Sequence, residues 1–174
     1  MRLIPFLVCA CLLLLTAVGC TRRPAPETTV ILVRHAEREN QGRNPRLTPD
    51  GERRAAALVD AIGRSGLDAI YVTKFNRTQQ TAAPTAAELN ITPTVVTVAG
   101  SAQAHADEIA ASIRENHAGK RVLVVGHSNT VPLIMHSLGV TAVRPVEEDE
   151  YGRLFILTLR KNEPPRLIEA RYGE

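Results

Sequence analysis

The sequence predicts an α/β fold, a three-layer sandwich in which a mostly parallel sheet carries helices on both faces. Two observations lead to this prediction. Apolar, strand-like runs at residues 28–33, 68–73, 92–98 and 120–126 alternate with helix-like segments, and such alternation is typical of parallel sheets. The first and last of these runs are almost continuously apolar, as expected for strands that are buried on both faces.

The first predicted helix, residues 47–66, has recognisable start signals. Thr48 is a suitable N-cap, and Pro49 occupies the first helical position, where proline is favoured because its missing N–H would have no partner. Leu58 and Ile62 lie four residues apart, which places them on one face of the helix. We expect this face to pack on the sheet.

Three more helices and a closing pair of strands complete the predicted domain. In the second helix, Pro84 marks either a kink or a late start. Gly139 ends the fourth helix. The helices are predicted at residues 77–89, 101–119 and 129–139, and the closing strands at residues 153–159 and 166–171.

Residues 1–19 differ from the rest of the chain. Arg2 provides a thin positive region, a long apolar stretch follows, and small residues lead to Cys20, a pattern typical of an export signal. An uncleaved membrane anchor is the alternative, but the apolar run contains Pro5 and is at the short end of what a bilayer requires. We therefore expect residues 1–19 to be a signal peptide that is removed.

The segment "TAVGC", residues 16–20, resembles the lipobox of bacterial lipoproteins, although Ala17 stands where that motif more often has Leu. Cys9 and Cys11 lie within the predicted signal peptide, so Cys20 is the one thiol of the mature chain. An exported protein with a single Cys cannot form an internal disulfide. Lipid attachment, palmitate included, accounts for Cys20 better than redox chemistry does.

These features predict three regions and a location. Residues 1–19 form the signal peptide, residues 20–27 the lipidated Cys and an extended tether with two prolines, and residues 28–174 the folded domain. We expect an exported lipoprotein that is anchored in a membrane and faces the periplasm or the cell exterior.

The composition argues against a nucleic-acid partner. The formal net charge is only +3, and the 21 Lys and Arg residues are scattered rather than clustered. Aromatic residues make up 3% of the chain and Trp is absent, which leaves few stacking platforms for single strands. We expect no nucleic acid among the partners.

Unusual polar residues follow three of the predicted strands. Arg34 and His35 end the first strand, Lys74 and Arg77 follow the second, and His127 follows the strand at 120–126. In open α/β sheets the ligand site lies beyond the carboxyl ends of the strands. Each residue alone could be an ordinary polar loop residue, but their joint placement predicts one site.

The motifs "LVRHAE", "TKFNRTQQTA" and "VLVVGHSNT", in this order, resemble those of the histidine phosphatase superfamily, which includes phosphoglycerate mutases and phosphohistidine phosphatases. The resemblance runs from Val30 to about Leu159 and implies a phosphoglycerate mutase-like fold. It also implies that His35 is the catalytic nucleophile, that Arg34 and Arg77 hold the phosphate, and that His127 donates a hydrogen bond to the transferring group.

The residue types suit phosphoryl transfer on physical grounds as well. The transferred group carries negative charge on three oxygens, and the planar guanidinium fork matches pairs of these oxygens. Nearby guanidinium charge lowers an imidazole pKa, which would keep His35 unprotonated and able to attack. Water would then hydrolyse the phosphohistidine. We expect a metal-independent phosphatase without a cofactor, acting on a small phosphorylated substrate.

Two departures from the family pattern concern the site. Ala36 replaces the Gly of the usual Arg-His-Gly motif, so the backbone there must adopt an ordinary conformation. Mutase-type members carry a Glu as general acid in a longer segment, and here Glu108 is the nearest candidate. The acidic cluster at residues 147–150 is another candidate, although both sites are also readily explained as solvated charges. Without a clear acid, the site would favour leaving groups that need little protonation.

Two other functions are compatible with parts of the sequence. The segment around Ser128 has the context of a nucleophile elbow, as in α/β-hydrolases, but only His136 follows it as a possible partner and the second Gly is replaced by Thr130. The other alternative is a lipoprotein that keeps the phosphatase scaffold but only binds a phosphorylated ligand or a protein partner.

Overall fold

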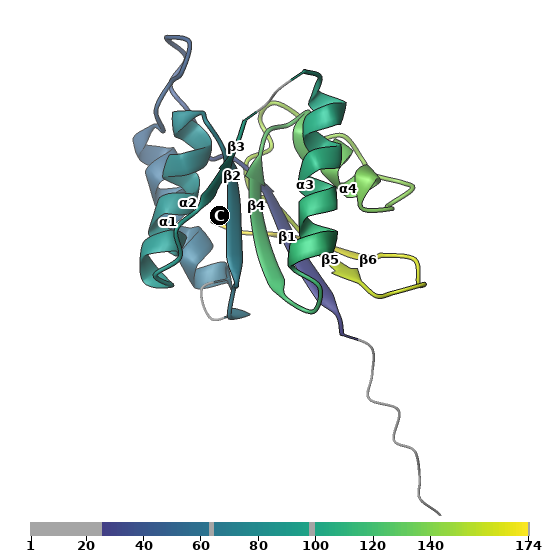
Figure 1. The fold of residues 1–174 in the computed structure, drawn as a ribbon. Coiled ribbons are helices and arrows are strands. Elements are labelled where there is room, and N and C mark those ends of the chain that lie inside the picture. Colours follow the sequence, from purple (N-terminus) through teal and green to yellow (C-terminus); the bar gives the residue numbers. More distant parts are fainter. Residues whose placement is uncertain (1–25, 63–64, 98–99, 174) are drawn as a thin grey trace, which may run out of the picture.

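The computed structural model describes residues 26–62, 65–97 and 100–173. They form one six-stranded sheet with two helices on each face (Figure 1), so the predicted α/β sandwich is confirmed. The strands are β1 (Thr28–Arg34), β2 (Ala69–Thr73), β3 (Thr94–Val96), β4 (Arg121–Gly126), β5 (Arg153–Leu159) and β6 (Arg166–Arg171). The helices are α1 (Pro49–Ile62), α2 (Asn76–Glu88), α3 (Ala102–Asn116) and α4 (Thr130–Ser137).

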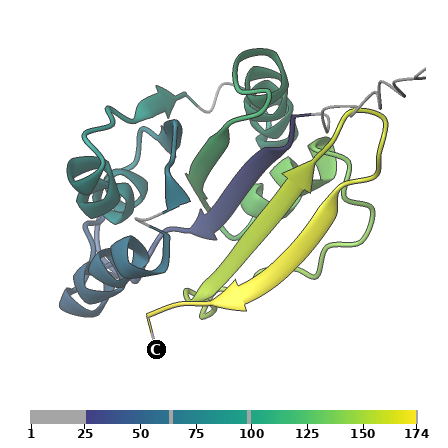
Figure 2. The ribbon, with the colours of Figure 1, turned by 90° about the horizontal axis from the view of Figure 1, so that it is seen from below.

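The strand order is β3-β2-β4-β1-β5-β6. The first four of these strands are parallel, whereas β5 and β6 run antiparallel to their neighbours. Figure 2 shows the antiparallel pair at one side of the sheet. Because β4 lies between β2 and β1, the carboxyl ends of these three strands meet at one edge. Arg34 is in register with Gly126, so the residues that follow β1 and β4 lie next to each other.

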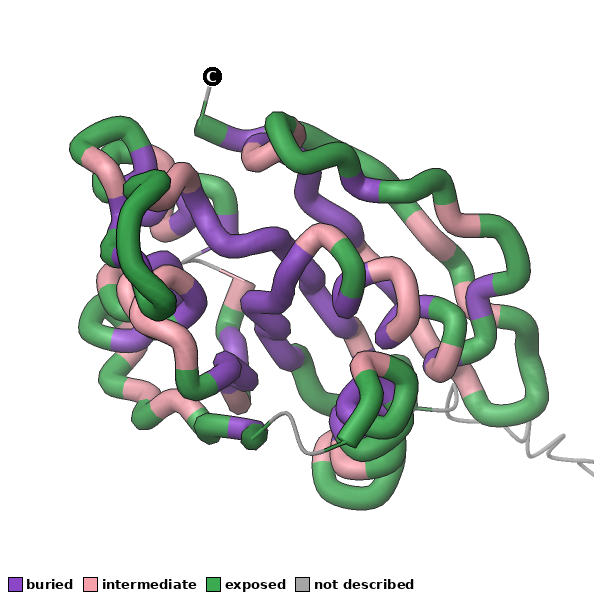
Figure 3. Tube along the Cα trace, turned by 90° about the horizontal axis from the view of Figure 1, so that it is seen from above, coloured by how far each residue is buried: buried purple, intermediate pink, exposed green. Residues whose placement is uncertain are grey.

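Alternate residues of β1 point into the two separate cores of the domain. Val30 and Leu32 lie in the core under α3 and α4, and Ile31 and Val33 in the core under α1 and α2. All four side chains are buried, which explains the continuous apolar run. In Figure 3 the buried part of the trace follows the central strands, and the exposed part follows the outer helices and loops.

Local signals set most of the helix boundaries. Thr48 caps α1 as predicted, because its hydroxyl accepts a hydrogen bond from the Gly51 N–H at 3.1 Å. Helix α2 begins at Asn76 and continues past Pro84, so the predicted late start is wrong. Strand β3 covers Thr94–Val96 of the run predicted at residues 92–98, whose last residue lies outside the described residues, and it pairs only with β2.

The predicted signal peptide and Cys20 lie outside the described residues, and both stay predictions. Among residues 26–62, 65–97 and 100–173, no helix has the length and hydropathy needed to cross a bilayer.

Candidate active site

A cavity of about 470 Å³ lies at the carboxyl edge of β1, β2 and β4. It brings together three of the residues that the sequence predicted, namely His35, Arg77 and His127. Its lining also includes Arg38, Phe75, Ala102, Ser128, Asn129, Thr130 and Glu148. Lys74 is exposed and does not line this cavity.

His35 lies at the buried floor of the cavity, with 3% of its surface exposed. Its Nδ1 is 2.8 Å from the carbonyl oxygen of Ala36. A carbonyl only accepts hydrogen bonds, so Nδ1 carries the proton and Nε2 keeps a free lone pair. The imidazole is therefore held in the tautomer that can attack through Nε2.

Burial lowers the pKa of His35 to about 3. The hydrogen bond to Ala36 opposes this shift, and the guanidinium charges of Arg34, Arg77 and Arg38 add to it. The expected effect of the arginines is thus present, but loss of solvation is the larger cause. At neutral pH the ring is uncharged.

His127 faces His35, with the two ring centroids 5.4 Å apart. Its Nδ1 lies 3.3 Å from the Arg77 guanidinium, and its Nε2 lies 3.1 Å from the Thr73 hydroxyl. A guanidinium only donates, so Nδ1 accepts from Arg77 and Nε2 carries the proton. Burial lowers the pKa of His127 to about 3, and the charge of Arg77 contributes. In the free protein this ring therefore offers Arg77 a lone pair.

Arg34 is not among the residues that line the cavity, and 2% of its side chain is exposed. Its Nη1 donates to the carbonyl oxygen of Glu147 at 2.8 Å, and its Nη2 donates to Glu148 Oε2 at 3.0 Å. The guanidinium carbon lies 4.1 Å from the centroid of the Tyr151 ring. The predicted phosphate-binding arginine is thus fixed against the segment that joins α4 to β5.

The threonines of the second motif hold the strand ends together. Thr73 contacts His127 at the end of β4. Thr81 accepts from the Ala36 N–H at 2.9 Å and donates to the Arg77 carbonyl at 2.7 Å. The motif therefore connects the loops that follow β1 and β4 to the start of α2, which explains the need for hydroxyl side chains at these positions.

Ala36 shows why glycine is not required after His35. Its side chain is fully buried, and the positive φ angles among the described non-glycine residues occur at Asn90 and Asn162. The backbone at Ala36 is thus in the ordinary region, as the sequence predicted. Glycine is required instead at Gly51, where a Cβ would come within 2.1 Å of the carbonyl oxygen of Glu37.

Arg77 and Arg38 are the cations at the cavity wall. The Arg77 guanidinium lies 4.4 Å from the centroid of Phe75, which orients it, and its buried Nε has no hydrogen-bond acceptor. The Nη1 of Arg38 donates to the carbonyl of Glu39 at 3.0 Å. An anion in the cavity would thus meet two guanidinium groups from different loops.

The carboxylate that reaches the cavity is that of Glu148, not that of Glu108. Glu108 is exposed on α3, whereas Glu148 lines the cavity and accepts from Ser128 Oγ at 2.5 Å. The hydrogen bond from Ser128 lowers the pKa of Glu148, and the charge of Arg34 adds to this effect. Glu148 is therefore ionised at neutral pH.

Sequence reasoning did not single out Arg38, Phe75 or Ser128 as members of the phosphate site, and it ranked Glu148 among weakly supported candidates. Arg38 follows the first motif by a few residues, and Phe75 and Ser128 stand within the other two motifs, so proximity to the motifs was the available signal.

The contact of Ser128 with Glu148 also shows that its hydroxyl is not paired with a histidine, which argues against the nucleophile-elbow alternative.

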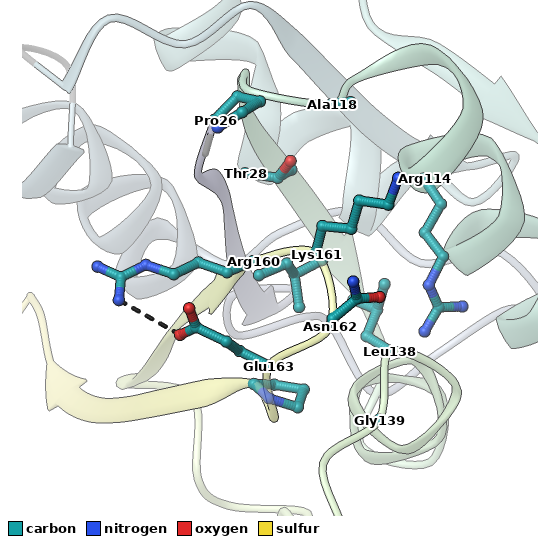
Figure 4. Close-up of a pocket in the computed structure, with 12 residues that line it drawn as sticks. Pro26, Thr28, Arg114, Ala118, Leu138, Gly139, Arg160, Lys161, Asn162 and Glu163 are labelled. Carbon is teal, nitrogen blue, oxygen red and sulfur yellow. Dashed lines mark hydrogen bonds and ion pairs between the residues drawn. The ribbon is translucent and has the colours of Figure 1, made fainter. Parts of the chain in front are cut away.

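A second, larger cavity of about 600 Å³ lies at the opposite edge of the sheet (Figure 4). It is formed where the described chain begins, next to the turn between β5 and β6, and its lining includes Pro26, Arg114, Leu138, Arg160 and Lys161. None of the motif residues lines it, so the smaller cavity is the candidate active site. Within the described part of the chain, no cluster of His, Cys, Asp and Glu side chains is arranged to hold a metal ion.

Comparison with known proteins agrees with the motifs. Residues 30–100 match the model of the histidine phosphatase superfamily (branch 1), a range that contains His35 and Arg77 but not His127. A search of curated proteins gave no match. The matched range covers less than half of the chain and includes the first two motifs.

Solved structures share the fold over most of the chain. A candidate phosphohistidine phosphatase SixA from Nakamurella multipartitia is 24% identical, with a TM-score of 0.61 over 86% of this chain and 99% of the other. A mycobacterial glucosyl-3-phosphoglycerate phosphatase is 13% identical, with a TM-score of 0.67 over 81% and 97% of the two chains. The protein histidine phosphatase SixA complexed with tungstate is 18% identical, with a TM-score of 0.59 over 82% and 96%. At these identities the likeness establishes the phosphoglycerate mutase-like fold.

Proposed function

We propose that this chain is a phosphatase of the histidine phosphatase superfamily that hydrolyses small phosphorylated compounds through a phosphohistidine on His35. The observation that carries the proposal is the state of His35. Its proton is fixed on Nδ1 by the Ala36 carbonyl, and its free Nε2 lies at the floor of a cavity walled by Arg38, Arg77 and His127. The proposed reaction uses side chains of the chain and one water molecule, which hydrolyses the phosphohistidine.

In the first step, Nε2 of His35 attacks the phosphorus atom in line with the leaving group. The Nε2–P bond forms as the bond from phosphorus to the leaving oxygen breaks, and the leaving group keeps the electron pair. Arg77 and Arg38 neutralise the phosphoryl oxygens. The Nε of Arg77 is buried without an acceptor, and a phosphoryl oxygen is an acceptor of the kind it lacks.

His127 is proposed to donate a hydrogen bond to the transferring phosphoryl group. The free protein holds it neutral, with a lone pair on Nδ1 toward Arg77. A phosphoryl dianion nearby raises an imidazole pKa, so substrate binding would draw a proton to Nδ1 and turn the acceptor into a donor. The role assigned from the motifs therefore depends on the bound anion.

Two arguments concern the substrate. The cavity, at about 470 Å³, is at the small end of ligand sites, which favours a compact phosphorylated molecule. The neighbours named above are described as phosphatases of phosphohistidine or of glucosyl-3-phosphoglycerate, and this chain is proposed to share their reaction class, phosphoryl hydrolysis.

The direct test is hydrolysis of p-nitrophenyl phosphate by the purified chain, compared with His35→Asn. We expect hydrolysis by the first protein and a loss of at least about 1,000-fold in the second, because the covalent route is removed. Lys74→Ala is the matched control, since Lys74 lies close to the site without lining it. Equal rates for the His35 variant and the unaltered chain would contradict the proposal.

The alternative is a non-catalytic lipoprotein that binds a phosphorylated ligand with the same residues. The absence of a clear general acid among the predicted residues favours it. Binding of inorganic phosphate without turnover of any aryl phosphate, and without loss of binding in His35→Asn, would support this alternative.

We also propose that Cys20 carries a lipid and that the domain is exported. The described chain begins at Pro26, at the amino end of β1, whereas the cavity lies at the carboxyl end of the same strand. Seven residues of strand span about 20 Å. The tether would thus join the domain at the end of β1 opposite to the active site. Replacement Cys20→Ser should release the protein from membranes; unchanged membrane association would contradict the anchor.

A further inference from the structure

We propose that Glu148 is the general base that activates the water molecule in the second half of the reaction. This inference rests on the proposed function, because it needs a phosphohistidine on His35. It assigns the hydrolytic step to a carboxylate from the segment between α4 and β5, which lies outside the three motifs that carry the family resemblance.

The first argument is that Glu148 lines the same cavity as the nucleophile. His35 is at the floor with 3% of its surface exposed, and the Glu148 side chain is at the rim with 77% exposed; both line the same cavity. In-line transfer sends the leaving group away from the nucleophile, which here means toward the rim. Water that attacks the phosphohistidine must approach along the same line, through the cavity that Glu148 lines.

The second argument is the protonation state of Glu148. Its Oε1 accepts from Ser128 Oγ at 2.5 Å and its Oε2 accepts from Arg34 Nη2 at 3.0 Å. Both contacts stabilise the ionised form and keep the pKa below its ordinary value. A carboxylate in this state can take a proton from water but has none to give to a leaving group. The protonation state of Glu148 therefore suits the second step and not the first.

The third argument is that no other acidic side chain lines the cavity in the described part of the chain. Glu150 is engaged by Arg144 and Arg153, and Glu108 lies on the exposed face of α3. Among the residues that line the cavity, Glu148 is the one with a carboxylate.

A purely structural role for Glu148, to hold Arg34, is not required by the geometry. The Arg34 guanidinium also donates to the Glu147 carbonyl and stacks on Tyr151. Glu148 itself is mostly exposed, and an exposed carboxylate contributes little to the position of a buried guanidinium. Its second hydrogen-bond donor, Ser128, also lines the cavity.

The proposed step balances as follows. The water oxygen forms a bond to phosphorus while the P–Nε2 bond breaks, and Nε2 of His35 recovers its lone pair. One water proton passes to the Glu148 carboxylate. Inorganic phosphate leaves, and the proton is then released to solvent, where the alkoxide or phenoxide from the first step takes it up.

The test is a rapid-quench experiment with p-nitrophenyl phosphate on the purified full chain and on Glu148→Gln. We expect the variant to release one equivalent of nitrophenol in a burst and then turn over at least about 100-fold more slowly than the unaltered chain, because a general base contributes about 100-fold or more. Phosphohistidine should accumulate in the variant. Asp149→Asn, which removes the neighbouring charge without touching the cavity, should behave like the unaltered chain.

The outcomes separate this inference from the function on which it rests. Accumulated phosphohistidine in Glu148→Gln supports both. Phosphohistidine that turns over equally fast in Glu148→Gln and Asp149→Asn overturns the role of Glu148 and leaves the proposed function standing. A slower burst with no accumulated intermediate would assign Glu148 to the positioning of Arg34 and overturn the base. If no protein forms phosphohistidine and His35→Asn is as active as the unaltered chain, the proposed function itself fails.

Discussion

Acid should destabilise this fold through its two active-site histidines. Burial holds the pKa of His35 and that of His127 at about 3, against an ordinary value of 6.5. Between these values the unfolded chain binds protons that the folded chain does not, so stability is present above about pH 6.5 and is lost as the pH falls toward 3. The relevant comparison is unfolding at pH 7 and at pH 5.

The magnitude follows from the pKa difference. A pH of 5 lies about 1.5 units below the unfolded pKa of each imidazole, and both rings are still neutral in the folded state. Each pH unit corresponds to about 1.4 kcal/mol in the free energy of unfolding. Each histidine therefore removes about 2 kcal/mol between pH 7 and pH 5, and the pair removes about 4 kcal/mol. Carboxylates such as Glu37 and Glu148 also contribute to the loss of stability in acid. Their contribution is the same in a variant that lacks only the two histidines, so the difference between the two proteins reports the histidines.

The assay is urea unfolding of the unaltered chain and of the double variant His35→Asn with His127→Asn at both pH values. The unaltered chain should lose about 4 kcal/mol more than the double variant, and the single variant His35→Asn should show about half of that difference. An equal loss in the unaltered chain and the double variant would refute the reasoning, because it would mean that neither imidazole is held neutral by burial.

Three further predictions concern the residues around the two histidines. Replacement Arg77→Ala should lower kcat/KM for an aryl phosphate by about 10- to 100-fold, since hydrogen bonds to charged groups are worth about 1.5–3 kcal/mol, and Arg77→Lys should recover only part of the loss because it lacks the planar fork. Replacement Thr81→Val should cost about 1–3 kcal/mol in urea unfolding, as it leaves the buried Ala36 N–H unpaired; no change would mean that another acceptor is within reach. Replacement Lys74→Ala should leave the steady-state rate within about twofold, and a large loss would place Lys74 at the substrate.

The sequence was informative wherever local periodicity and strand position decide the structure. The alternation of strands and helices predicted the sheet, and the rule that parallel strands end at one edge predicted that His35, Arg77 and His127 would meet. Both predictions are confirmed by the fold, because they depend on backbone direction and not on side-chain detail.

The place of Arg34 shows where that reasoning ends. Even-numbered residues of β1 point toward the core under α3 and α4, the same core that contains Val140 and Val146 from the segment after α4. Arg34 continues this alternation, and its guanidinium contacts Glu147 and Glu148. The alternation along β1 could be seen in the sequence. That the segment after α4 would lie against Arg34 could not.

The carboxylate was harder to place for a different reason. Residues 147–150 are all acidic, and no periodicity distinguishes one from another in a loop. Glu148 is selected by contacts with Ser128 and Arg34, which are 20 and 114 residues away in the chain. Helical periodicity does account for Glu108, since the buried residues of α3 include Ile109 and Ile113 but leave position 108 on the outer face.

The measurement that tests the central claim most directly is the identification of the phosphorylated residue. The purified chain should be mixed with p-nitrophenyl phosphate, denatured in alkali within the first turnovers, and digested for mass spectrometry under conditions that preserve phosphohistidine. The account predicts a phosphoryl group on His35, absent from His35→Asn and lost on brief exposure to acid. Turnover of the substrate with the phosphoryl group on another residue, or with full activity in His35→Asn, would contradict it.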